Sequence, residues 1–299
     1  MSSLRDVGVV IVTYASAATV EGTLAALPTD RLGAVVVVDN SSPDDTVAVV
    51  RGLGATVVEQ PNLGFGAGNN RGERELPDDL DLVLFLNPDA VLQTADLERM
   101  VEHLAAHERC AVVGPRVLSG GRPTYSAGRL PTLASELRPL LPDPLSRVGP
   151  RRRLPVDYAV SGPVGYVEGA CFLVRRAPFQ DVGGFDEGYF LYAEELELAQ
   201  RLRRRGWQVH LCAGAVVEHA MGVSTAGTQH GGSPHLVTSM VRYLRRWHGE
   251  RAARTWVRVA RASWVLRSRT GRLGRQEAQA LRAAAAQALS HPPPPPAAA

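Results

Sequence analysis

Short aliphatic runs alternate with longer mixed segments over the first 115 residues of the chain. Because the aliphatic runs lack polar alternation, they are typical of parallel strands that are covered on both faces. The predicted strands are Val7–Thr13, Ala34–Asp39, Thr56–Glu59, Leu80–Leu86 and Cys110–Val113, and the predicted helices are Ala17–Leu27, Asp44–Leu53, Gly66–Arg74 and Ala95–His107. This alternation predicts a doubly wound α/β sheet.

The regular pattern weakens over residues 119–165, where Pro, Arg and Gly are frequent, and this segment is predicted to be a variable insertion. Order returns with a predicted strand, a glycine turn and a helix, followed by basic helices and an Ala-rich helix: Val164–Val174, Gly183–Gly184, Ala193–Arg204, His235–Arg269 and Arg275–Leu289. We therefore predict an α/β domain over residues 1–235, a basic helical extension over 236–290 and a disordered Pro/Ala tail over 291–299.

With 299 residues, of which 45% are hydrophobic, the chain is long enough to bury one large core. It contains no run of about 18 apolar residues and no leader pattern in its first six residues, so we expect no membrane span and a cytoplasmic location. Cys110, Cys171 and Cys212 form no Cys-x-x-Cys pair. We expect them to be small buried side chains in a reducing compartment.

The net charge of +3 hides an asymmetry. From Met240 onward, 12 Arg stand against Glu250 and Glu277, which gives 12 − 2 = +10 and leaves about −7 for the preceding residues. Such a split indicates an acidic partner, such as nucleic acid or an anionic membrane, or the solvated face of packed helices. Trp247, Trp256 and Trp264 are interspersed at helical spacings, so both interpretations remain open at this point.

Polar residues follow several of the predicted strands. In open α/β sheets the carboxyl ends of the strands line the ligand crevice, so we expect Thr13–Tyr14, Asp39–Asn40 and Asn87–Asp89 to meet there. No Gly-x-Gly-x-x-Gly follows the first strand, which argues against a dinucleotide site. The glycines of Gly64–Gly68 either bring backbone N–H groups close to a phosphate or form a structural turn.

Seven motifs in sequence order resemble the signatures of family 2 glycosyltransferases, and they are most similar to the rhamnosyltransferase-like branch. They are Val10–Tyr14, Val37–Ser42, Asn62–Gly72, Leu86–Asp89, Glu168–Ala170, Gly183–Glu187 and Phe190–Leu198, and the resemblance covers about residues 7–222. It implies a GT-A fold, which is a doubly wound mixed α/β sheet, here with a C-terminal helical extension. It also implies inverting transfer of a sugar from a nucleoside-diphosphate donor to an acceptor hydroxyl.

The resemblance also implies a site that holds Mg²⁺ or Mn²⁺. Asp89 matches the main ligand of the family's Asp-x-Asp motif, in which Asn87 replaces the first carboxylate. His219 matches the histidine after the last strand and is the second expected ligand. Without the resemblance, Asp89 is explained as a turn residue and His219 as a hydrogen-bonded histidine.

The family resemblance also implies roles for residues in the crevice. The expected donor-binding residues are Thr13, Tyr14, Asp39, Asn40, Gly66, Asn69, Arg71, Asn87 and Asp89. Glu195 stands where the family has an Asp that acts as general base, and Glu194 either orients the acceptor or exchanges roles with it. The alternative is that Glu194, Glu195 and Glu197 all only favour the first turn of a helix through its dipole.

The implied donor is a dTDP- or UDP-linked sugar, with rhamnose or another deoxysugar favoured, and the implied acceptor is a lipid-linked glycan or a small metabolite. We expect no nucleic acid partner. The basic helices predict either peripheral membrane contact or packing on the catalytic domain or in a homodimer. Two other functions stay open. They are a sugar-phosphate nucleotidyltransferase, although Tyr14–Ala17 lacks the glycines and basic residues of its loop, and a catalytically silent nucleotide-sugar-binding protein.

Overall fold

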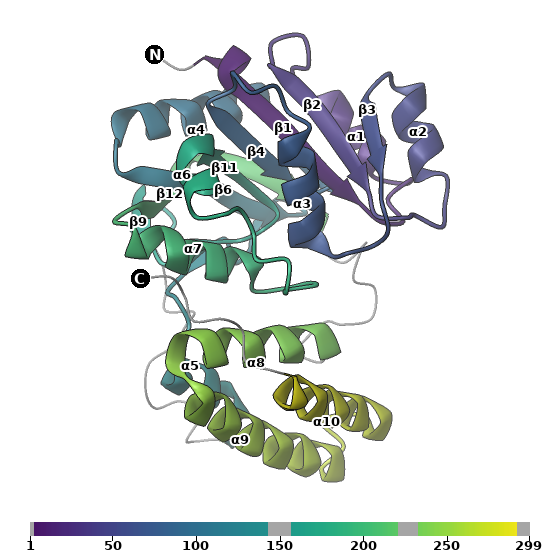
Figure 1. The fold of residues 1–299 in the computed structure, drawn as a ribbon, viewed down its shortest axis with the longest axis vertical. Coiled ribbons are helices and arrows are strands. Elements are labelled where there is room, and N and C mark those ends of the chain that lie inside the picture. The colour runs from purple at the N-terminus through teal and green to yellow at the C-terminus, as the bar shows by residue number, and fades with distance from the viewer. Residues whose placement is uncertain (1–2, 143–156, 221–232, 292–299) are drawn as a thin grey trace. The chain divides into compact units, whose positions relative to one another are not determined.

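The computed structural model describes residues 3–142, 157–220 and 233–291, and within these the chain forms two compact units (Figure 1). The α/β unit falls within Met1–Gly128, Pro155–Gly188 and Glu194–Ala226, and the helical unit within Arg129–Leu154, Tyr189–Ala193 and Gly227–Ala299. Part of the predicted insertion therefore groups with the C-terminal helices. Residues 143–156 of that insertion and 292–299 of the predicted tail lie outside the described residues, and the domain limits stay a prediction.

A ten-stranded mixed sheet forms the centre of the α/β unit, in the order β3-β2-β1-β4-β11-β6-β12-β5. The strands β1 to β4 are parallel, β11 runs antiparallel between β4 and β6, and β5 runs antiparallel to β12. Their bounds are β1 Val7–Thr13, β2 Ala34–Asp39, β3 Thr56–Glu59, β4 Leu82–Leu86, β5 Ala90–Leu92, β6 Cys110–Ser119, β11 Cys171–Arg175 and β12 Gln208–His219. The short strands β7 (Arg122–Pro123) and β9 (Gly162–Val164) pair with β6 and β12, and β8 (Ala127–Gly128) pairs with β10 (Tyr166–Val167).

The helices of this unit are η1 Leu4–Asp6, α1 Val20–Ala26, α2 Thr46–Gly52, α3 Phe65–Arg74, α4 Thr94–Ala106, α6 Arg176–Asp181 and α7 Glu194–Arg204. The first three strands match the prediction at both ends. The prediction of one strand over Val164–Val174 was wrong. β9, β10 and β11 are three separate strands, β10 pairs with β8 in a small second sheet, and residues 168–170 lie between β10 and β11, where the Glu168 N–H donates to the Ser126 carbonyl.

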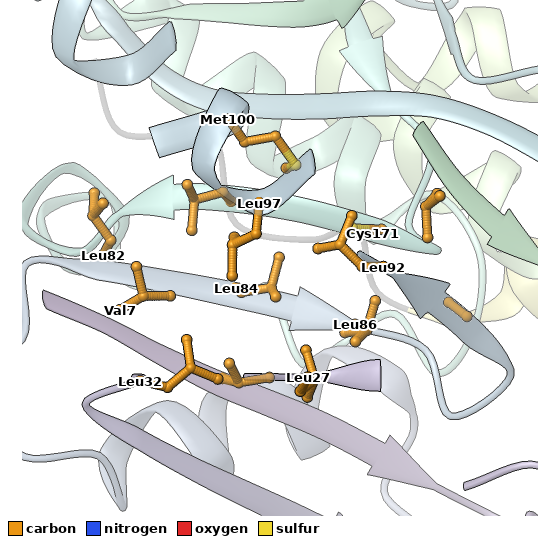
Figure 2. Close-up of a cluster of buried hydrophobic side chains, with 14 of the residues drawn as sticks. Val7, Leu27, Leu32, Leu82, Leu84, Leu86, Leu92, Leu97, Met100 and Cys171 are labelled. Carbon is orange, nitrogen blue, oxygen red and sulfur yellow. The ribbon is translucent and has the colours of Figure 1, made fainter. Parts of the chain in front are cut away.

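One face of the sheet is covered by aliphatic side chains from α1 and α4. Alternate residues of β1 and β4, such as Val7 and Leu84, point to this face and are almost fully buried (Figure 2). Leu97 and Met100 of α4 pack against them. Because burying such a side chain contributes roughly 1.5–3 kcal/mol, this cluster is a main source of stability. The three cysteines are also buried, as predicted, and burial raises the pKa of the Cys110 thiol to about 12.

On the opposite face, glycines allow α3 to approach β1 very closely. A Cβ atom on Gly68 would lie 2.7 Å from Val12 Cγ1, and one on Gly72 would lie 2.3 Å from Val10 Cγ1. The two glycines are one helical turn apart, so both face the strand. The position of α3 is therefore set by the absence of side chains at these two residues.

The helical unit contains α5 (Leu133–Leu137), η2 (Arg138–Leu140), α8 (Pro234–His248), α9 (Glu250–Arg269) and α10 (Arg275–Ser290). Trp256 and Trp264 of α9 are buried, with ring centroids 6.2 Å apart. The Trp256 indole N–H donates to the Glu136 carbonyl at 3.2 Å. These two tryptophans therefore pack inside the helical unit, and neither is exposed for contact with a membrane.

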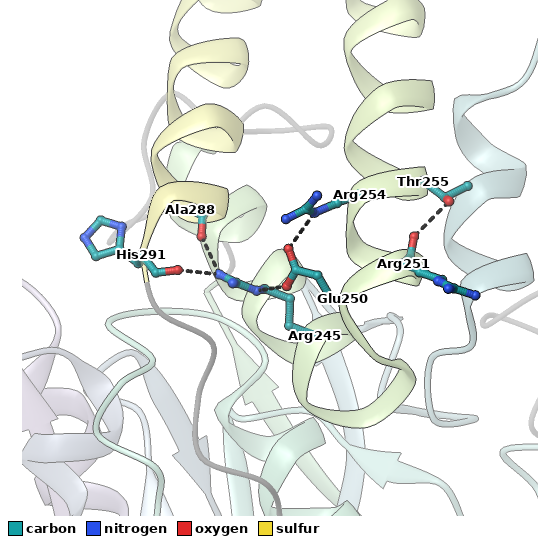
Figure 3. A network of polar contacts seen from close by, with 7 residues as sticks. All are labelled: Arg245, Glu250, Arg251, Arg254, Thr255, Ala288 and His291. Atoms are coloured by element: carbon teal, nitrogen blue, oxygen red, sulfur yellow. Dashed lines mark hydrogen bonds and ion pairs between the residues drawn. The ribbon is translucent and has the colours of Figure 1, made fainter.

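A polar network joins three helices of this unit (Figure 3). Arg245 of α8 donates to Glu250 of α9 at 2.6 Å and to the carbonyls of Ala288 and His291 at 3.0 and 2.8 Å. Hydrogen bonds from Arg254 and then Arg245 hold the pKa of Glu250 below its usual range. Among the helices that the structure describes, none combines the length and apolarity that crossing a membrane requires.

We predict that Gly72→Ala lowers the free energy of unfolding by about 1–3 kcal/mol, because the β-branched Val10 has no room to move away from the new methyl group. Gly22→Ala in α1 is the matched control, since nothing lies within 4 Å of its added Cβ and the helix gains about 0.5–1 kcal/mol. Urea denaturation of both variants measures the difference. Equal stability of the two variants would contradict the close-approach argument.

Candidate functional site

The carboxyl ends of β1, β2 and β4 lie side by side, as predicted. Thr13 is in register with Asp39, and Ile11 with Leu86. The Thr13 hydroxyl donates to Asp39 Oδ1 at 2.8 Å, and the Ser42 N–H donates to Asp39 Oδ2 at 2.8 Å. Asp39 is only 1% exposed, so its carboxylate is held rigidly at the end of the strand. Tyr14, by contrast, is half exposed.

Asp89 and His219 come together although 130 residues separate them. The short strand β5 begins at Ala90, which is in register with His219 at the end of β12. His219 Nε2 lies 3.0 Å from Asp89 Oδ1 and 3.4 Å from Asn87 Nδ2. The Ala220 N–H donates to the Asp89 carbonyl, which fixes the backbone on both sides of the contact.

The Asp89 carboxylate and the His219 imidazole have the spacing of two ligands of one cation. In an octahedron with bonds of about 2.1 Å, neighbouring ligand atoms are about 3.0 Å apart. The Asp89 side chain is 4% exposed and that of His219 is 17% exposed, so the pair sits at the edge of the buried region. Both residues therefore fit a divalent cation, with the amide of Asn87 beside them.

Asn40 and Asn69, which we expected to bind the donor, hold the backbone around the start of α3. The Asn40 amide donates to the Gly64 carbonyl at 3.1 Å, and the Asn69 amide donates to the Phe65 carbonyl at 3.0 Å. Gly66 lies in the first turn, where an added Cβ would be 3.6 Å from Glu194 Cγ. These contacts bring the start of α3 next to the start of α7.

Arg71, the cation expected near the donor phosphates, lies later in α3 and pairs with Glu75 at 2.7 Å. Both side chains are substantially exposed, so this pair contributes little to stability and can open at small cost.

Glu194 and Glu195 occupy the first turn of α7. Glu194 is 2% exposed, whereas Glu195 is partly exposed. The third glutamate of this turn, Glu197, has a structural role, since its carboxylate forms a buried ion pair with Arg201 at 2.6 Å. This buried ion pair with Arg201 accounts for Glu197 without a role in the reaction.

Residues with an unfavourable backbone conformation lie next to several residues of the candidate site. The described residues contain four non-glycine residues with positive φ: Ala15 at 52°, Ser41 at 59°, Tyr192 at 72° and Ala193 at 70°. Ala15 follows Tyr14, Ser41 follows Asn40, and the other two directly precede α7. Such conformations cost of order 1–3 kcal/mol each and concentrate at functional sites.

Sequence reasoning missed Asn70, which joins α3 to the glycine turn before α7. Its amide donates to the Phe185 carbonyl at 2.9 Å, and its carbonyl oxygen accepts from the Phe185 N–H at 2.8 Å. Both residues lie within motifs quoted for the family resemblance. Nothing in the sequence around either residue indicates that they pair across 115 residues.

The motif Glu168–Ala170 reaches the same edge. The Ala170 carbonyl accepts from the Asn87 N–H at 2.9 Å, directly before β11 pairs with β4. An added Cβ on Gly169 would lie 3.9 Å from the Phe65 ring. Motifs that are far apart in the sequence therefore gather around the ends of β1, β2 and β4 and the start of α3.

Comparison with known proteins identifies the family. The family model "Glycosyl transferase family 2" matches residues 8–183, which is more than half of the chain. The chain belongs to glycosyl transferase family 2. This glycosyltransferase is therefore an enzyme of the predicted class, and the nucleotidyltransferase and silent-protein alternatives are set aside.

Two curated relatives of this chain are named as rhamnosyltransferases. An N-acetylglucosaminyl-diphospho-decaprenol L-rhamnosyltransferase of Mycobacterium tuberculosis is 32% identical over 233 residues, which covers 71% of this chain and 75% of that protein. The rhamnosyltransferase WbbL of Escherichia coli is 29% identical over 154 residues, which is 49% of this chain and 57% of that protein.

A solved structure, that of GalNAc-T7 with UDP, GalNAc and Mn²⁺, has a TM-score of 0.57 at 17% identity. The match covers 82% of this glycosyltransferase and 48% of the GalNAc-T7 chain, so this chain spans about half the length of that protein. The likeness confirms the predicted GT-A fold.

Proposed function

We propose that this glycosyltransferase moves rhamnose or another deoxyhexose from a dTDP- or UDP-linked donor to a hydroxyl of a lipid-linked acceptor, with inversion and with help from Mg²⁺ or Mn²⁺. The observation that carries the proposal is the pairing of Asp89 and His219, 3.0 Å apart, at the carboxyl end of β4. The names of the curated relatives support the donor sugar and the lipid-linked acceptor.

In this proposal Asp89 and His219 hold the cation, and Asn87 orients a ligand beside them. When bound, the cation neutralises the charge that develops on the leaving diphosphate. Asp39 accepts hydrogen bonds from the nucleoside, for which its buried position and fixed orientation prepare it. Thr13 has its hydroxyl turned to Asp39 and so acts by orienting that carboxylate.

Glu195 is the proposed general base. Its carboxylate takes the proton of the acceptor hydroxyl while that oxygen forms a bond to the anomeric carbon. The bond from this carbon to the diphosphate oxygen breaks, and the oxygen keeps the electron pair. A single displacement of this kind inverts the configuration at the anomeric carbon. Glu194, buried against the start of α3, positions the helix from which Glu195 projects.

The helical unit offers a surface for an anionic membrane that carries a lipid-linked acceptor. Arg251, Arg254, Arg258 and Arg261 are exposed at spacings of three and four residues, so they share one face of α9. Each contributes on the order of 1 kcal/mol to attraction at low salt. Since Trp256 and Trp264 are buried, the proposed association is electrostatic and reversible.

We predict that the correct donor raises the melting temperature in the presence of Mn²⁺ and that Asp89→Ala removes most of this shift. The side chain fills no apolar core, so the apo variant is expected to melt close to wild type. A thermal-shift panel of dTDP- and UDP-sugars, with and without Mn²⁺, measures both effects. A shift that is the same in Asp89→Ala and wild type would refute the metal assignment.

We predict that Glu195→Gln lowers kcat by about 10² or more while KM for the donor changes little, because a general base acts only in the chemical step. The matched variant is Glu194→Gln on the same helical turn, for which a smaller loss is expected. Steady-state release of nucleoside diphosphate provides the measurement. If Glu194→Gln has the larger effect on kcat, the two roles must be exchanged.

We predict that the enzyme co-sediments with anionic vesicles at low salt and is released at high salt, where charges are screened. Replacing Arg258 and Arg261 with Glu is expected to abolish binding. Replacing the exposed Arg122 and Arg203 of the α/β unit with Glu changes the net charge equally and serves as the control. An absence of binding at low salt would exclude the membrane role and favour a soluble acceptor.

A further inference from the structure

Three histidines gather at the amino ends of β6 and β12, away from the candidate catalytic site. His103 lies in the last turn of α4 and His107 caps the end of this helix, and their rings stack with centroids 4.2 Å apart. His210, the third residue of β12, meets both rings edge-on at 5.2 and 5.1 Å. His219 ends the same strand nine residues later, roughly 25–30 Å along an extended chain.

We propose that His103, His107 and His210 form a second metal site, which binds a Zn²⁺-like cation and is independent of sugar transfer. One ligand atom from each residue can be chosen so that all lie within 4.8 Å of one another. Among the described residues, no carboxylate or thiol joins this group.

Hydrogen bonds to outer partners fix which nitrogen carries the lone pair in two of the three rings. His107 Nδ1 donates to the His103 carbonyl at 2.8 Å, so its Nε2 carries the lone pair of the neutral ring. His210 Nε2 donates to Gln208 Oε1 at 2.9 Å, which leaves the lone pair on Nδ1. Outer partners of this kind orient the imidazole ligands of metals.

The third ring, His103, can bind the cation after a shift of one proton. His103 Nε2 and His210 Nδ1 are 2.9 Å apart, and in the metal-free protein the Nε2–H of His103 fills the space between them. When a cation takes this place, His103 carries its proton on Nδ1 instead, and no net proton is released. A tetrahedral site with bonds of about 2.05 Å needs nitrogens about 3.3 Å apart, so the stacked His103 and His107 rings must turn towards a shared ion.

The three imidazole ligands determine which cation this site prefers. Three neutral imidazoles suit Zn²⁺, Ni²⁺ or Cu²⁺, whereas Mg²⁺ prefers oxygen ligands and retains its water. His107 is exposed, which gives the ion a path from solvent and leaves room for water as a fourth ligand.

The test is calorimetric titration of Zn²⁺ into the full chain carrying Asp89→Ala, which weakens the candidate catalytic metal site. Adding His107→Ala is expected to reduce Zn²⁺ affinity at the second site by at least about tenfold, the lower range seen for loss of an outer partner. The matched control is His291→Ala. His291 is also exposed, and its Nδ1 donates to the carbonyl four residues earlier, but among the described residues it belongs to no histidine cluster.

Excess Mg²⁺ is expected to leave this Zn²⁺ binding unchanged, and His107→Ala alone is expected to retain sugar transfer with Mg²⁺. Equal Zn²⁺ affinity in the His107→Ala and His291→Ala proteins would overturn the proposal, as would displacement of Zn²⁺ by Mg²⁺. Circular dichroism verifies that the variants fold, and His107→Gln, which keeps a polar side chain at this exposed position, serves as the second variant.

Discussion

The candidate catalytic site depends on a short covalent tether, the segment between Leu86 at the end of β4 and Ala90 at the start of β5. Four residues span at most about 14 Å. In the sheet order β4 and β5 are four strand spacings apart, which is about 19 Å in a flat sheet. The sheet must therefore curl until the end of β12 reaches the tether. This curl places His219 against Asp89.

The second constraint is the close approach of α3 to β1. Gly68 and Gly72 bring the helix against the strand, and Asn70 then holds the turn at Phe185 that leads towards α7. The start of α7, with its two glutamates, is consequently positioned from the same helix that begins beside Asn40. Local hydrogen bonds hold the strained backbone at Ala15 and Ser41, because the Ala15 N–H donates to Ser42 Oγ at 3.0 Å and the Ser41 hydroxyl donates to the Gln60 carbonyl at 2.9 Å.

Much of this architecture was predictable because Val, Ile and Leu runs identify strands, and β1, β2 and the partly exposed edge strand β3 were placed to the residue. The three residues of β5 are too few for any periodic pattern, so the pairing that unites Asp89 with His219 rested on family resemblance alone. Asn40 and Asn69 bond to the backbone around the start of α3, and their expected contact with the donor stays a prediction. The roles of Glu194, Glu195 and Arg71 stay predictions. The histidine cluster escaped notice because His210 is 107 residues from His103.

The helical unit combines a segment from the middle of the chain with helices from its C-terminal part, which are synthesised later. Trp256 of α9 donates to the carbonyl of Glu136, and Arg267 donates to that of Pro139, in each case across at least 120 residues. During translation, residues 129–142 leave the ribosome long before α8, α9 and α10 exist. This segment cannot pack against these helices while the intervening strands of the sheet are being synthesised. A nascent chain that stops before α9 therefore exposes a surface for chaperones, even if its sheet has already closed.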